Sequence, residues 1–257
     1  MGGNGVQMSR YFVNADQIED KRIRIFGEDY QHLKKVLRAV KGDIITVCCE
    51  GCDYTAEIDD IGNDYIGTII KATDRNKTEP PVKVTLFQGL PKADKMELIV
   101  QKCIELGVTE IVPVMTERSI SKINADKDAK NKVSRWQKIA LEAAKQCNRG
   151  IVPMIGMPVK FLDALNLAAD KDLSIIPYEK ESAVSFKDIA SGCSNITTAS
   201  IFIGPEGGFT EQEIEESEAV GIRKITLGPR ILRTETAGMV ALSLMMYELG
   251  DVSNGRT

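Results

Sequence analysis

The sequence predicts an α/β protein made of two unequal domains, a small β-rich domain followed by a larger one built on a parallel sheet. Three observations support this prediction. Strand-like segments occupy residues 8–72, a polar stretch ending in two prolines occupies residues 73–81, and strand-like and helix-like segments alternate over residues 82–251. A chain of 257 residues is long enough to give each domain a core of its own.

The first domain is expected to be a small β-barrel of about sixty residues. Its segments alternate apolar and polar residues with period two, and pairs that contain glycine separate them as turns. Strands are expected at residues 22–25, 44–47 and 65–70, turns at residues 42–43, 50–51 and 62–63, and one short helix at residues 30–37. Residues 1–7 resemble an added leader or an alternative start, so the domain is counted from Met8. Residues 73–81 are the expected linker.

The second domain is expected to form a parallel sheet with helices on both faces, because strands and helices alternate from residue 82 onward. Residues 94–97 and 210–213 have the form of a capping box, and each predicts the start of a helix. Gly107 predicts the end of the first of these helices. Strands are expected at residues 84–87, 111–114, 173–176, 199–203 and 224–227, with further helices at residues 131–147 and 234–249.

Charge and hydropathy limit the classes of function. The net charge of −4 argues against wholesale coating of nucleic acid, although residues 10–41 carry eight Lys or Arg against five Asp or Glu. No apolar run approaches the length of a membrane span, and the N-terminus lacks the layout of a signal peptide. We therefore expect a cytoplasmic protein without a membrane partner.

Six cysteines are scattered without a disulfide framework. The spacing of Cys49 and Cys52 would suit two zinc ligands, but structural zinc needs a second pair, and the one histidine, His32, lies in a different local pattern. A strand that runs into a glycine turn is the favoured interpretation of residues 48–52, and no metal is expected.

Two loops contain the residues that are expected to form a binding site. Residues 203–209 leave a strand and open a capped helix through Gly-Pro-Glu-Gly-Gly, which exposes backbone N–H groups suited to a phosphate, a carboxylate or the edge of a purine. Neither the Walker pattern nor the G-x-G-x-x-G pattern is present, and a plain tight turn is the alternative. In residues 227–237, Arg230 and Arg233 bracket apolar Ile231 and Leu232, a mixture that an ordinary solvated turn does not need.

Both loops resemble those of the RsmE family of SPOUT methyltransferases. The resemblance covers nearly the whole chain and extends to Arg10-Tyr11-Phe12, His32 to Arg38, Lys95-Met96-Glu97, Glu105 to Val108, Thr116 to Ser119 and Glu142 to Arg149. It implies S-adenosylmethionine-dependent methylation of N3 of a specific uridine, U1498, in 16S rRNA of the small ribosomal subunit. It also implies a PUA-like RNA-binding barrel at residues 8–72, a SPOUT domain with a deep trefoil knot at residues 82–251, and a homodimer, to which the apolar last helix is expected to contribute.

The resemblance further implies which residues enclose the cofactor and act on the base. Cofactor contacts are expected from Ile176, Pro177, Ile203, Gly204, Pro205, Glu206, Gly207, Gly208, Leu227, Gly228, Ile231 and Leu232. Arg233 is the candidate to stabilise negative charge on the uracil ring, because the N3 proton must leave before or as nitrogen attacks the methyl group. Glu235 is the candidate base or orienting group, with an ordinary acidic residue in a first helical turn as the alternative.

RNA contacts are expected from both domains. The candidates are Arg10, Arg22, Arg24, Lys34, Lys35 and Arg38 in the first domain and Arg118, Gln146 and Arg149 in the second. Solvated surface residues without a partner are the alternative for both sets. His32 is more readily a packed or hydrogen-bonded residue than a catalytic one.

Two other functions stay open, a SPOUT methyltransferase for another RNA and a non-catalytic RNA-binding protein whose loops hold a nucleotide. Whether free rRNA or the assembled subunit is the substrate, and how two subunits share a site, stays open as well.

Overall fold

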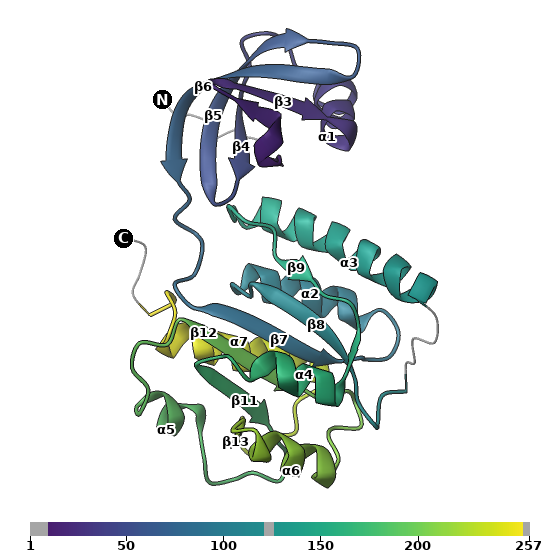
Figure 1. The fold of residues 1–257 in the computed structure, drawn as a ribbon, viewed down its shortest axis with the longest axis vertical. Helices are drawn as coiled ribbons and strands as arrows, with labels where there is room; N and C mark the ends of the chain where they lie inside the picture. Colours follow the sequence, from purple (N-terminus) through teal and green to yellow (C-terminus); the bar gives the residue numbers. More distant parts are fainter. Residues whose placement is uncertain (1–9, 121–125, 254–257) are drawn as a thin grey trace. The chain divides into compact units, whose positions relative to one another are not determined.

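The structure, a computed structural model, describes residues 10–120 and 126–253 (Figure 1). The chain divides into two compact units. The first combines the residues up to Glu79 with a later segment, residues 144–152, and the second contains residues 80–143 and the residues from Pro153 onward. No local pattern in the sequence had indicated that residues 144–152 join the first unit.

The first unit is built on a mixed six-stranded sheet in the order β1-β4-β5-β6-β3-β2. The β1–β4 pair is parallel and the other pairs are antiparallel. The strands are β1 (Arg10–Phe12), β2 (Ile18–Glu19), β3 (Arg22–Phe26), β4 (Ile44–Cys49), β5 (Cys52–Ile61) and β6 (Tyr65–Arg75). A short 3-10 turn, η1 (Ala15–Gln17), precedes β2, and helix α1 (Gly27–Gln31) continues into a π-helical turn, η2 (His32–Val36). The expected strands and short helix are present, and β6 runs on to Arg75, inside the stretch expected as linker.

Alternation along the strands builds the core of this unit. In β3 the side chains of Ile23 and Ile25 are buried while Arg22, Arg24 and Phe26 are exposed. The inward residues meet those of the other strands in one cluster that includes Tyr11, Tyr30, Leu33, Val47, Ile58 and Ile66. The exposed positions of β3 are therefore free to carry charge.

The cysteine-rich segment forms a tight hairpin. Glu50 and Gly51 have φ values of 49° and 79°, and this pair of left-handed residues makes a two-residue turn whose twist matches that of the flanking strands. Cys49 and Cys52 lie opposite each other at its base. The interpretation as a strand running into a glycine turn is thus confirmed. Among the described residues, no three His, Cys, Asp or Glu side chains gather in a way that would hold a metal ion.

The second unit has a sheet of seven strands that are all parallel, as the alternation predicts. Its order is β10-β8-β7-β12-β11-β13, and β9 pairs with β8. The strands are β7 (Lys83–Gly89), β8 (Glu110–Met115), β9 (Met154–Ile155), β10 (Val159–Lys160), β11 (Leu173–Pro177), β12 (Thr198–Ile203) and β13 (Arg223–Ile225). The central strands are buried on both faces, since β12 carries five consecutive buried residues.

Helices cover both faces of this sheet. The helices are α2 (Lys95–Glu105), α3 (Asp126–Gln146), α4 (Phe161–Ala168), α5 (Phe186–Ala190), α6 (Glu211–Ala219) and α7 (Thr234–Glu248). In Figure 1, α4 and α6 lie on the near side of the sheet and α2 and α7 lie behind it. On the near side Phe87 and Phe202 stack with ring centroids 4.5 Å apart, within one buried cluster. On the other side α7 packs closely, and a Cβ on Gly238 would lie 3.4 Å from the Gln88 side chain. No helix in the described part of the chain is long and apolar enough to cross a membrane.

One predicted capping box forms and the other does not. The Thr210 hydroxyl accepts a hydrogen bond from the Glu213 amide, and the Glu213 carboxylate accepts one from the Thr210 amide. Helix α6 therefore begins as predicted. The box predicted at residues 94–97 is wrong, because Asp94 has ψ of 11° rather than the extended value that aims a capping side chain at the helix, and it makes no capping bond. Its carboxylate instead lies 3.5 Å from the Arg135 guanidinium.

Candidate functional site

Both motif loops follow strands of the parallel sheet at the same edge. Residues 204–209, called the glycine loop here, follow β12, and residues 226–233, called the arginine loop, follow β13. Because the carboxyl ends of parallel strands share one edge of a sheet, the ends of β7 and β11 lie there too. This edge is where open α/β sheets bind ligands.

Close packing holds the glycine loop in shape. A Cβ on Gly89, at the end of β7, would lie 2.7 Å from the backbone nitrogen of Pro205, so only glycine allows the loop to lie this close to the strand. A Cβ on Gly204 would come within 3.1 Å of the Gly208 backbone. Gly208 has φ of 66°, and its amide closes the turn with a 2.9 Å bond to the Pro205 carbonyl.

Arg118 holds the same loop from the end of β8. Its Nη1 donates to the carbonyl oxygens of Gly207 at 3.0 Å and Phe209 at 3.2 Å. The buried carboxylate of Glu213 accepts the Glu117 amide at 2.9 Å and ties the two segments together a second time. Arg118, one of the expected RNA contacts, is exposed, and its guanidinium already bonds the glycine loop.

A buried neutral link joins the glycine loop to the first residue of α7. The Nε2 of Gln88, which is fully buried, donates to the Thr234 hydroxyl at 2.9 Å, and that hydroxyl donates to the Gly204 carbonyl at 2.6 Å. These bonds bring together three segments distant in the chain. Gln88 had not been selected from the sequence, where it looks like any other residue at a strand end.

An ionic contact also connects the glycine loop to the first turn of α7. Lys95 Nζ lies 2.8 Å from a carboxylate oxygen of Glu206 in the glycine loop and 3.5 Å from one of Glu235 in the first turn of α7. The Lys92 amide donates to Glu206 at 3.1 Å. Burial alone would raise the pKa of the Glu206 carboxyl, but the bond from Lys95 and those from the backbone amides of Glu206 and Lys92 hold it below its ordinary value. Lys95 belongs to a motif that resembles the family's, but no role had been predicted for it.

The two candidate catalytic residues flank the start of α7. Arg233 is the residue before the helix and is exposed, and no described residue forms a hydrogen bond or ion pair with its guanidinium. The Glu235 side chain is 14% exposed, and its Oε2 is buried with no hydrogen-bond donor among the residues that the structure describes. An unpaired cation and a nearly buried carboxylate therefore lie two residues apart.

The arginine loop leaves apolar side chains open to solvent. Gly228 has φ of 96° with no atom within 4 Å of a built Cβ, and Ile231 is 89% exposed while Leu227 and Leu232 are half-buried. The segment after β11 borders this loop, since the Thr226 amide donates to the Val184 carbonyl at 2.8 Å. The expected cofactor residues thus gather at one edge, except that the Ile176 and Ile203 side chains are buried in the core.

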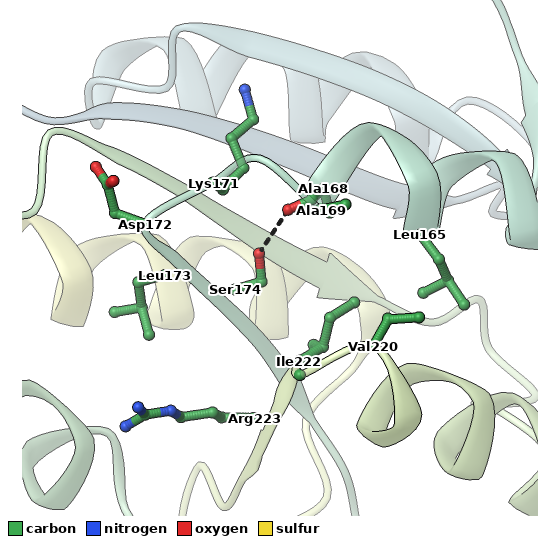
Figure 2. A pocket seen from close by; sticks show the side chains of 11 residues that line it. Leu165, Ala168, Ala169, Lys171, Asp172, Leu173, Ser174, Val220, Ile222 and Arg223 are labelled. Atoms are coloured by element: carbon green, nitrogen blue, oxygen red, sulfur yellow. Dashed lines mark hydrogen bonds between the residues drawn. The ribbon is translucent and has the colours of Figure 1, made fainter.

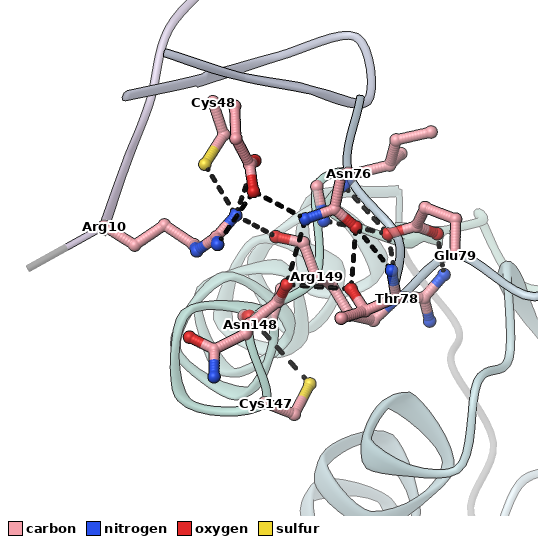
Figure 3. A network of polar contacts seen from close by, with 12 residues as sticks. Arg10, Cys48, Asn76, Thr78, Glu79, Cys147, Asn148 and Arg149 are labelled. Carbon is pink, nitrogen blue, oxygen red and sulfur yellow. Dashed lines mark hydrogen bonds and ion pairs between the residues drawn. The ribbon is translucent and has the colours of Figure 1, made fainter. Parts of the chain in front are cut away.

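Two of the expected RNA-binding residues, half-buried Arg10 and buried Arg149, belong to a polar network of the first unit (Figure 3). Arg10 donates to both carboxylate oxygens of Asp53 at 2.7 and 3.0 Å and to the Arg149 carbonyl at 3.2 Å. Arg149 is 3% exposed, and its Nη2 lies 2.6 Å from the Glu79 carboxylate. Burial raises the pKa of the neighbouring Cys48 thiol to about 12. The network ties residues 144–152 to the rest of the first unit.

The other expected RNA-binding residues lie on the surface. Arg22 is paired with Asp59 at 2.9 Å, and Lys34 donates to the Tyr30 hydroxyl at 2.6 Å. Arg24, Lys35, Arg38 and Gln146 are exposed. His32 lies 3.3 Å from the Tyr11 hydroxyl through its Nδ1, which matches the structural interpretation of this residue.

A pocket of about 110 Å³ lies at the opposite edge of the sheet, where β11 and β13 begin (Figure 2). Its lining includes Ser174, whose hydroxyl donates to the Ala168 carbonyl at 3.5 Å, and Arg223. Asp172 borders it, but its carboxylate is occupied by the backbone and hydroxyl groups of Thr197 and Thr198. None of the expected site residues lines this pocket.

Comparisons with known proteins agree with the geometry. Residues 78–246 match a family model described as an RNA methyltransferase domain. Ribosomal RNA small subunit methyltransferase E of Bacillus subtilis (strain 168) is 38% identical over 251 residues, 94% of this chain and 97% of that protein. The protein of the same name from Mesomycoplasma hyopneumoniae (strain 232) is 32% identical over 92% of this chain and 98% of its own length. A crystal structure of ribosomal RNA small subunit methyltransferase E from Neisseria gonorrhoeae bound to S-adenosyl methionine has a TM-score of 0.84 at 30% identity, covering 95% of this chain and 99% of that one.

Proposed function

The chain belongs to the RNA methyltransferase family, and on this basis we propose that it methylates N3 of uridine U1498 in 16S rRNA of the small ribosomal subunit with S-adenosylmethionine. The observation that carries this proposal is the link from Gln88 through Thr234 to Gly204, which holds the glycine loop against the segment bearing Arg233 and Glu235. The relatives support the substrate class, because two that are 38% and 32% identical are named as methyltransferases of small-subunit ribosomal RNA.

The residues at the carboxyl edge fit this cofactor. Exposed backbone of the glycine loop suits hydrogen bonds to a purine, and Leu227, Ile231 and Leu232 offer apolar surface for its faces. The Glu179 carboxylate lies beside Gly208, where a negative charge suits the positive charges of the cofactor. When bound, the cofactor supplies a methyl group activated by its sulfonium. The cofactor contacts expected from the sequence are proposed here, with Ile176 and Ile203 contributing backbone atoms because their side chains are buried.

Arg233 and Glu235 are proposed to have different roles toward the uracil base. Removal of the N3 proton leaves negative charge spread over N3, O2 and O4, and the unpaired guanidinium of Arg233 is suited to stabilise it. Glu235 is the group proposed to accept the proton, because one of its oxygens has no hydrogen-bond donor within the described part of the chain. The N3–CH3 bond forms as the carbon–sulfur bond breaks, and S-adenosylhomocysteine and a proton are released.

The first unit is proposed to bind rRNA as a PUA-like barrel. Arg24, Lys35 and Arg38 are exposed cations on β3 and around η2, and phosphate contacts need cations of this kind. Arg10 and Arg149 are instead proposed to stabilise the fold of this unit, since both guanidinium groups already bond carboxylates. Arg22, Lys34, Arg118 and Gln146 remain proposed contacts.

A deep trefoil knot, a homodimer and a cytoplasmic location complete the proposal. The sheet order supports the knot, because β11 lies between β12 and β13, so the chain crosses β11 after β12. Partly exposed Leu244 and Tyr247 on α7 support a dimer contact.

Calorimetric titration and mass mapping test the function. The purified protein should bind S-adenosylmethionine saturably, and small subunits from a strain that lacks the gene should gain 3-methyluridine at U1498 when protein and cofactor are added. No binding at near-millimolar cofactor would contradict an enzyme and favour a non-catalytic RNA-binding protein. Methylation of transfer RNA or 23S rRNA instead would contradict the substrate.

A further inference from the structure

Lys95 lies between carboxylates from two segments that enclose the site. Its ammonium is 2.8 Å from Glu206 of the glycine loop and 3.5 Å from Glu235 of α7, and the three side chains are 31%, 26% and 14% exposed. The two contacted oxygens are therefore at most 6.3 Å apart, the length of the two contacts laid end to end. Two negative charges at this separation repel each other strongly where water is partly excluded.

We propose that Lys95 is a positioning residue of the cofactor site, whose ammonium holds the glycine loop and the start of α7 together by neutralising Glu206 and Glu235. This inference rests on the proposed function of that site. Lys95 does not touch the base or accept its proton. It acts through the two carboxylates, one of which is the proposed base.

The contact differs from an ordinary surface ion pair. Pairs within one turn of a helix contribute little, and Lys102 with Glu105 on the same helix is such a pair, at 2.9 Å. Lys95 instead joins residues 111 and 140 positions away in the chain, and Glu235 Oε2 is buried and has no hydrogen-bond donor in the described part of the molecule. Lys95 is thus the cation nearest to a carboxylate that would otherwise lie uncompensated beside Glu206.

The fold itself does not need this cation. The Gln88–Thr234–Gly204 link and the bonds from Arg118 hold the backbone of the glycine loop without Lys95. Removing Lys95 should therefore leave the cofactor-free protein folded, and the two carboxylates should move apart and deform the loop that contacts the cofactor. Removal of Lys95 is therefore expected to lower the affinity for the cofactor and to leave the unfolding temperature of the cofactor-free protein unchanged.

The test is calorimetric titration of the full chain with S-adenosylmethionine. Lys95→Met should lower the affinity at least tenfold, while the matched control Lys102→Met on the same helix should stay within twofold of the unchanged protein. Lys95→Arg, which keeps the charge, should keep most of the affinity. The double variant Lys95→Met with Glu206→Gln should regain part of the lost affinity, because one of the two repelling charges is gone.

The outcomes separate this inference from the proposed function. If the unchanged protein binds no cofactor, the proposed function fails and this inference fails with it. If the unchanged protein binds and Lys95→Met binds equally well, only this inference is overturned. A fall in the unfolding temperature of cofactor-free Lys95→Met, without recovery of affinity in the double variant, would assign Lys95 to the fold and overturn the inference as well.

Discussion

Gln88 and Thr234 share a 2.9 Å hydrogen bond across 146 residues of chain, and both side chains are buried. Since the same threonine hydroxyl donates to the Gly204 carbonyl, a single oxygen atom connects β7, the glycine loop and α7.

Thr234→Val should destabilise the protein and weaken cofactor binding. The substitution keeps the volume of the side chain but removes one of the two acceptors of the Gln88 amide, which keeps its 3.1 Å bond to the Gly89 carbonyl, and removes the hydroxyl donor of the Gly204 carbonyl. Each buried group that loses its partner costs about 1–3 kcal/mol. Urea unfolding measures the loss. Thr236→Val is the matched control on the same helical turn, where the side chain is exposed, and it should change the free energy of unfolding by no more than about 0.5 kcal/mol. Equal effects of the two variants would contradict a role for the link.

Gly89→Ala should be poorly tolerated. The new Cβ would lie 2.7 Å from both the nitrogen and Cδ of Pro205, so strand and loop must separate, at about 1–3 kcal/mol. Gly192→Ala is the control, since its nearest neighbour would be 3.7 Å away, an ordinary contact. Thermal unfolding should show a lower midpoint for Gly89→Ala alone. A Gly89→Ala variant as stable as the control would show that the loop can shift freely.

Arg233→Ala should lower the rate of methyl transfer about a hundredfold while cofactor binding is kept. The guanidinium has no partner within the described residues, so its removal leaves no unpaired charge and should not disturb the fold. Single-turnover methylation of small subunits measures the rate, and calorimetry measures the binding. Arg223→Ala, at the opposite edge of the sheet, is the control for loss of a positive charge. Unchanged turnover would remove Arg233 from the mechanism.

Arg149→Met should destabilise the first unit by about 3–5 kcal/mol, because it leaves the Glu79 carboxylate without its buried cation. The pair of exposed Arg22 and partly buried Asp59 supplies the contrast, since Arg22→Met removes a solvated cation and should cost only about 0–1 kcal/mol. Guanidinium unfolding followed by near-ultraviolet spectroscopy measures both. If Arg149→Met instead keeps its stability and loses only RNA affinity, the assignment of Arg149 to structural support is wrong.

Asp172 should make stability depend on acid pH. Bonds from the backbone amides and hydroxyls of Thr197 and Thr198 lower the pKa of its carboxyl from 3.8 to about 2. Because the pKa of the folded state is the lower one, this stabilisation is present above the ordinary pKa and is lost as the pH falls toward 2. Asp172→Asn should therefore show a flatter decline of unfolding temperature across this acid range than the unchanged protein. Parallel curves would contradict the prediction.

The parallel sheet and its site edge could be predicted from the sequence because mainly apolar strands alternate with helices over residues 82–251. The mainly apolar segment 199–203 followed by Gly-Pro-Glu-Gly-Gly predicts a loop that leaves a strand, and in a parallel sheet such a loop lies at the carboxyl edge. The Thr210 capping box worked for a similar reason, because all of its partners lie within four residues.

The contacts that complete the site could not be predicted, because they join residues far apart in the chain. Neither the Lys95–Glu206 pair nor the bond from Gln88 to Thr234 leaves a local pattern. Helix α4 was missed because Lys160, at its start, makes no capping bond, whereas α5 carries a capping box of Ser185 and Asp188 that could have been found. The capping box predicted at Asp94 failed for a different reason. Its residue types match the pattern, but the Asp94 backbone is not extended, so its side chain cannot cap the helix.

Residues 144–152 have a consequence for the synthesis of the chain. The first unit lacks this segment, and with it Arg149 as partner of Glu79 and Arg10, until about seventy residues after Glu79 have been translated. At about 5–20 residues per second, the ribosome leaves the β-rich unit incomplete for several seconds while the first strands and helices of the second unit emerge. The two units are therefore expected to mature together, and a nascent chain halted just after Glu79 should be more sensitive to proteases than one halted well beyond Val152.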